Sequence, residues 1–153
     1  MNLSQQLAKH FRDVYYGENY TGVNIKESIK NIDWIQATTE VQNLNTIAAL
    51  IFHMNYYVNI VMKTLQGGPL EGNDKYAFDL PPIHSQADWE NLLHKFWSDA
   101  DTFANLIEEL TEDQLGEPFL DGKYGTYFRN LNGVIEHNYY HLGQISLIKK
   151  IIS

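Results

Sequence analysis

The chain has 153 residues and a formal net charge of −8, from 19 acidic and 11 basic residues. Binding to a phosphate backbone requires a basic face, and no basic run is longer than Lys149-Lys150, so we expect no nucleic-acid partner. The absence of cysteine excludes disulfides, thiolate metal sites and cysteine nucleophiles.

Hydrophobic periodicity predicts a first helix at about residues 2–16 and a second at about residues 45–66. Glycines at 17 and 22 interrupt the pattern after the first helix, and a short amphipathic piece follows them. Its apolar positions are Ile25, Ile29 and Ile32. For the second helix, Asn45 is the expected N-cap, and Gly67-Gly68-Pro69 is typical of a helix end.

A third helix is expected at about residues 85–110, where Ser85 and Asp88 resemble a capping box, and a fourth at about residues 126–152. No segment shows the alternation of a half-buried strand. The sequence therefore predicts an all-α fold, and a bundle is the usual way for four amphipathic helices to bury their apolar stripes.

The connection between the second and third helices is unusually long, at residues 67–84. Connections in bundles are typically about 2–8 residues. A segment of this length can return along a helix, which would make the two helices parallel, and it can equally form a lid over a site.

Two of the six histidines, His137 and His141, lie four residues apart in the fourth helix. This spacing stacks both imidazoles on one helical face, where they can bind one ion. His141 lies seven residues from both Val134 and Ile148, so it falls in the apolar stripe. Two imidazoles in a core need a partner, and a cation satisfies both. The pair lacks the glutamate of an HExxH site, which excludes a zincin.

His53 is the candidate third ligand, because it lies in the middle of the second helix beside its apolar stripe. The alternative for each core histidine is a structural role, with the ring bonded to a backbone carbonyl. His10, His84 and His94 have no such context and are expected on the surface or in loops.

These residues carry a resemblance to a known family. Segment 45–53, which ends at His53, and segment 133–144, which contains His137 and His141, resemble the metal-binding helices of the DinB/YfiT-like superfamily of metalloenzymes. The resemblance covers essentially the whole chain. It implies a four-helix bundle with up-down-down-up topology, a homodimer, and a divalent metal ion, zinc or nickel, on His53, His137 and His141.

The resemblance also suggests a chemistry. Characterised members of the family include S-transferases and an isomerase that use low-molecular-weight thiols, although no residue here marks a thiol-binding site. Three histidines leave coordination positions open, so the ion can activate a thiol or a water molecule. The sequence thus predicts a metal-dependent S-transferase or hydrolase acting on a small molecule. The alternative is a non-catalytic bundle that binds a metal or small ligand.

Glu136, Asn138 and Gln144 are candidate partners for the outer ring nitrogens of the histidines. Tyr57 and Tyr140 lie one helical turn from His53 and His137, and are expected either at the core edge or as donors to a substrate.

The length suits one domain over residues 1–153. The first residues lack the basic and then apolar pattern of a signal peptide, and polar residues break every long apolar stretch. We therefore expect a cytoplasmic protein that does not cross a membrane.

Overall fold

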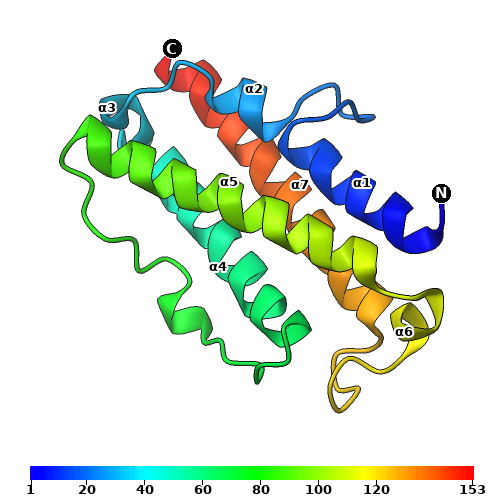
Figure 1. Cartoon of the computed structure of the whole chain (residues 1–153). Helices are drawn as coiled ribbons and strands as arrows, with labels where there is room; N and C mark the ends of the chain where they lie inside the picture. Colours follow the sequence, from blue (N-terminus) through cyan, green and yellow to red (C-terminus); the bar gives the residue numbers. More distant parts are fainter.

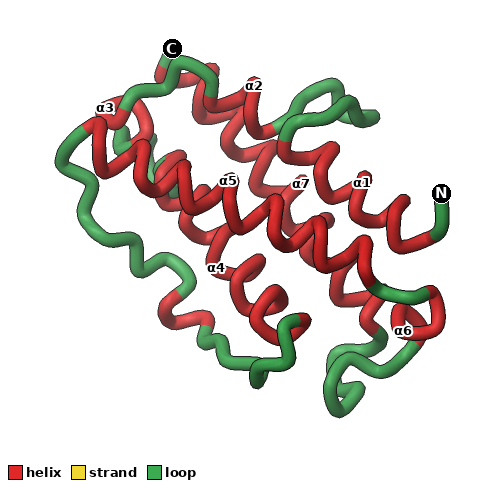
Figure 2. Tube along the Cα trace, viewed as in Figure 1, coloured by secondary structure: helices red, strands yellow, loops and turns green.

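The computed structural model describes all 153 residues and is all-α, as Figure 2 shows. The only pairing of strand type is an isolated bridge between Pro118 and Thr126. The all-α prediction is confirmed. In chain order the elements are α1 Leu3–Tyr15, α2 Ile25–Ile29, α3 Trp34–Ala37, α4 Ile47–Leu65, the 3-10 turn η1 Asp74–Tyr76, α5 Gln86–Glu109, α6 Glu112–Gly116 and α7 Tyr127–Ile152.

The four longest helices pack side by side (Figure 1). Helices α1 and α4 each contact both α5 and α7, so α4 and α7 are neighbours, as a site shared by His53, His137 and His141 requires. One cluster of 29 buried residues fills the space between the helices. Its largest members are the aromatic side chains of Phe11, Tyr15, Trp89, Phe96 and Phe103. None of the helices combines the length and the apolar character that crossing a membrane requires.

The predicted caps were partly wrong. Thr46, and not Asn45, caps α4, because its hydroxyl accepts a hydrogen bond from the amide of Ala49 at 3.1 Å. Two good capping residues stand side by side there, and the apolar period does not distinguish them. At α5, Ser85 is the N-cap and accepts from the amide of Asp88, but the Asp88 carboxylate accepts from the amide of His84.

The amphipathic piece at residues 25–32 is not one helix. Asn24 caps α2 and Asp33 caps α3, and Asn31 between them has a φ of 61°. This left-handed conformation cannot continue a helix, and asparagine is one of the few residues other than glycine that adopts it readily. The three expected isoleucines are buried all the same: Ile25, Ile29 and Ile32.

The segment from 66 to 85 returns along the side of the molecule from the end of α4 to the beginning of α5 (Figure 1). It starts with Gly67 at a φ of +90°, and the amides of Gly67 and Gly68 bond back to the carbonyls of Thr64 and Lys63. These two bonds form a Schellman motif, which ends α4 at the predicted glycines. The returning segment covers one side of α4, the helix that carries His53.

Candidate metal centre

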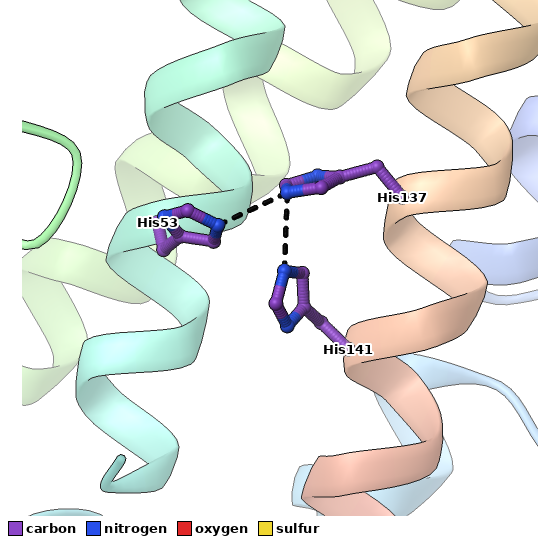
Figure 3. Close-up of side chains that lie close together, drawn as sticks. All are labelled: His53, His137 and His141. Carbon is purple, nitrogen blue, oxygen red and sulfur yellow. Dashed lines mark hydrogen bonds between the residues drawn. The ribbon is translucent and has the colours of Figure 1, made fainter. Parts of the chain in front are cut away.

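Three histidines that lie far apart in the sequence meet between α4 and α7, and their Nε2 atoms face one another (Figure 3). The Nε2 atom of His137 lies 3.0 Å from the Nε2 atom of His53 and 3.0 Å from that of His141. His53 and His141 are buried and His137 is partly buried. The spacing of four on α7 thus stacks two rings on one face, and packing of α4 against α7 adds the third.

The outer nitrogens of two rings have hydrogen-bond acceptors. His53 Nδ1 lies 3.1 Å from the Ala77 carbonyl oxygen, and His141 Nδ1 lies 2.6 Å from Gln144 Oε1. Because a carbonyl oxygen only accepts, each of these Nδ1 atoms is assigned the proton. The Nε2 atoms of His53 and His141 then carry lone pairs directed at the centre of the group.

Of the three candidate outer partners, Gln144 is the one whose side chain lies at hydrogen-bond distance from an outer ring nitrogen of the group. Glu136 accepts from Arg129 and Asn132 instead, and the Asn138 amide donates to the hydroxyl of Tyr15. The Nδ1 atom of His137 is buried without a hydrogen-bond partner. The contact of His53 with a carbonyl fits the structural alternative, but it uses Nδ1 and leaves Nε2 free for the group.

Burial keeps the rings neutral. It lowers the pKa of His137 to about 4, helped by the neighbouring His141 and His53. Burial also lowers the pKa of His53 and of His141. A proton on His137 Nε2 can be donated to only one of its two close nitrogen neighbours, so the lone pair of the other Nε2 atom would have no donor. A divalent cation satisfies all three lone pairs at once, and the group is compatible with a metal site.

Aromatic side chains cover the group on several sides. Phe78, from the returning segment, stacks on the His53 ring with centroids 3.9 Å apart and an angle of 7°. Tyr57 meets the rings of His53 and His137 edge on, at 5.1 and 5.0 Å. Its hydroxyl donates to the Asp74 carboxylate, and burial together with Asp74 raises the pKa of Tyr57 to about 12. Tyr57 thus lies at the edge of the core, and its hydroxyl is already hydrogen-bonded to Asp74. Tyr140 is largely exposed.

No carboxylate completes the group as a fourth ligand. Beside His137 lies an open cavity of about 360 Å³, with Tyr57, Tyr124 and Arg129 in its wall. His10, His84 and His94 are exposed and lie outside the group, as expected. The sequence did not indicate Ala77, since any residue supplies a backbone carbonyl, nor Phe78, whose segment has no periodic pattern.

In a comparison with protein families, the model of the DinB superfamily matches residues 29–145. The chain belongs to the DinB superfamily. The matched region covers about three quarters of the chain and contains all three histidines, so the group lies inside the part that defines the family. A search of curated proteins and a search of solved structures found no match.

The lowered pKa values predict a pH dependence for this DinB protein in its metal-free form. The pKa of His137 is about 4 in the folded chain and near 6.5 when the ring is exposed by unfolding. The unfolded state therefore binds the proton first, and stability should fall as the pH drops from about 6.5 towards 4. Urea unfolding in the presence of a chelator measures this loss.

The matched control is His137→Gln, which keeps a polar side chain without a titrating ring. Its stability should fall less steeply over the same pH interval, because the acidic residues titrate equally in both proteins. Identical slopes for the two proteins would contradict the prediction.

Proposed function

We propose that this chain is a divalent-metal-dependent enzyme of the DinB type, in which His53, His137 and His141 hold a zinc or nickel ion through Nε2. The observation that carries the proposal is the convergence of three Nε2 atoms, with 3.0 Å contacts to His137 from both sides. The acceptors on Nδ1 of His53 and His141 support it, because ligating histidines usually donate their second ring proton to such groups.

The chemistry follows from the open side of the group. Three protein ligands leave a position free, where the bound ion would lower the pKa of a thiol or a water molecule and so supply a nucleophile near neutral pH. The chain itself holds the ligand rings in orientation through Ala77 and Gln144, and shields them from water with Phe78 and Tyr57. The cavity beside His137 has room for a small-molecule substrate.

We favour a thiol S-transferase over a hydrolase. No carboxylate joins the group, and the Tyr57 hydroxyl is already bonded to Asp74, so neither a carboxylate nor Tyr57 is free to transfer a proton beside the histidines. Hydrolysis usually needs such a residue, whereas a thiolate attacks without a general base. Because the chain has no cysteine, the sulfur would come from a free low-molecular-weight thiol. The second candidate is a non-catalytic bundle that binds a metal or small ligand. It is supported by the absence of a carboxylate acid or base from the histidine group.

The deciding experiment loads the purified chain with zinc or nickel and assays a panel of electrophiles with and without a low-molecular-weight thiol. Turnover that requires both metal and thiol is the expected result. Turnover with metal alone would identify the hydrolase. Metal binding without turnover over the whole panel would favour the binding protein, and absence of metal after loading would overturn the proposal.

The proposal extends to the wider features of the family: an up-down-down-up order of the four long helices, one domain over residues 1–153, a cytoplasmic location and a homodimer. The return of segment 66–85 to the start of α5 supports this order, because it allows α4 and α5 to run in parallel (Figure 1). The dimer rests on the family resemblance, and a monomeric mass by light scattering at micromolar concentrations would count against it.

A further inference from the structure

Arg129, Gly133, His137 and His141 follow one another at intervals of four along α7 and share one face of the helix. The arginine side chain lies over the glycine: a Cβ atom at Gly133 would be 3.3 Å from Arg129 Nη1. Gly133 has no side chain and leaves space on this face of the helix. The structure gives that space to the guanidinium, which extends along the helix towards His137.

The guanidinium and His137 line the same cavity of about 360 Å³. Gly133 and His137 are four residues apart, which corresponds to about 6 Å along the helix axis. The cavity wall also includes Tyr57, Val61 and Tyr124. The cavity wall thus combines a permanent cation, apolar and aromatic side chains, and one member of the histidine group.

The arginine is only weakly paired within the protein. Its single ionic contact is from Nη1 to Glu136 Oε2 at 3.4 Å, and both side chains are mostly exposed. Glu136 also accepts a shorter bond of 2.9 Å from Asn132. The other guanidinium nitrogens of Arg129 make no hydrogen bond to the chain. An N–H edge of the guanidinium is therefore available to bind a carboxylate with two parallel hydrogen bonds.

We propose that this cavity binds a small molecule through a carboxylate held by Arg129. The ligand's apolar body lies against Tyr57, Val61 and Tyr124, and its reactive end lies about one helical turn away, beside the histidines. The inference rests on the proposed function and specifies its substrate class. Because the net charge is −8, the surface repels anions on average. A carboxylate should therefore bind at Arg129 in preference to other parts of the surface. The carboxylate belongs either to the thiol or to the electrophile.

Two matched probes test the inference: 4-mercaptobenzoate and its neutral amide, 4-mercaptobenzamide. Binding is measured by calorimetry and by chemical-shift changes, first on the metal-free chain. The carboxylate should bind about tenfold more tightly than the amide, as expected for a hydrogen-bonded ion pair. Arg129→Gln should abolish this preference. Glu136→Gln should strengthen carboxylate binding severalfold, because it removes a competing like charge.

Two further variants separate position from charge. Lys123→Gln removes a cation that lies over the Tyr124 ring but does not line the cavity, and it should leave the preference unchanged. Gly133→Ala adds a methyl group close to Nη1 and should reduce the preference at constant charge. Alanine also favours the helix over glycine, so this loss would not reflect unfolding. Circular dichroism of each variant checks the fold.

Equal binding of the two probes, or an equal loss in Lys123→Gln and Arg129→Gln, would overturn the inference. Because these titrations need no metal, they remain informative if the histidines hold no ion. Conversely, intact metal binding with no carboxylate preference would overturn this inference alone. With cobalt in place of zinc, a visible thiolate-to-cobalt band would assign the carboxylate to the thiol. Carboxylate binding without that band would assign it to the electrophile.

Discussion

Zinc affinity should fall at least about a hundredfold in the His137→Ala variant. His137 is the middle member of the group, since its Nε2 atom lies 3.0 Å from the Nε2 atoms of both other rings. Its loss leaves two ligands on different helices. Loss of an outer partner alone typically weakens metal binding about 10–100-fold, so loss of a ligand should do at least as much. Competition with a chromophoric chelator measures the change.

The stability of the protein should change in parallel. At free zinc about a thousand times the dissociation constant, binding adds about 4 kcal/mol to the free energy of unfolding. The wild-type chain should gain this amount on loading, and His137→Ala should gain no more than about 1.4 kcal/mol at the same free zinc, which corresponds to a hundredfold loss of affinity. His94→Ala is the matched control, because His94 is exposed and lies outside the group. If His137→Ala kept wild-type zinc affinity, or His94→Ala lost it, the ion would bind elsewhere.

The second large effect is expected at Trp89, in the core of the protein. The Trp89 side chain is completely buried, and its indole nitrogen donates to the Ile32 carbonyl at 2.9 Å, which ties α5 to the segment between α2 and α3. Trp89→Ala should lower the free energy of unfolding by about 3–5 kcal/mol from the lost packing. The unsatisfied Ile32 carbonyl should add about 1–3 kcal/mol.

Urea unfolding of the metal-free protein measures this loss, and Trp89→Phe separates its two causes. Phenylalanine keeps most of the apolar volume but cannot donate to Ile32. Its destabilisation should therefore be clearly smaller than that of Trp89→Ala. A loss below about 1 kcal/mol in the alanine variant would mean that the indole is not a main support of the core.

The residues that could be predicted from the sequence are those whose positions follow from local periodicity. The pair His137 and His141 needed only the helical repeat, and the burial of Ile25, Ile29 and Ile32 needed only their spacing. His53 was a weaker inference, because its contact with the pair depends on how α4 packs against α7. The family resemblance supplied that step.

Other parts of the site depended on tertiary structure. The Ala77 carbonyl reaches His53 because segment 66–85 folds back along α4. Every residue has a backbone carbonyl, so the residue type at position 77 could not predict this contact. Arg129 occupies its position because Gly133, one turn further along α7, has no side chain. The pattern of apolar residues, from which the helices were predicted, carries no information on this contact. The N-cap at Thr46 was missed because the neighbouring Asn45 is an equally good candidate.

The separation of the ligands along the chain has a consequence for the order of events during synthesis. His53 and His137 are 84 residues apart, and α7 is the last helix of the chain. When α4 has left the ribosome, it offers only one imidazole of the group, and a single imidazole binds a metal ion weakly. Domains are made from the N-terminus onwards at about 5–20 residues per second, so several seconds separate the first ligand from the last. The group can form only after α7 has docked, and acquisition of an ion would therefore mark the completion of folding.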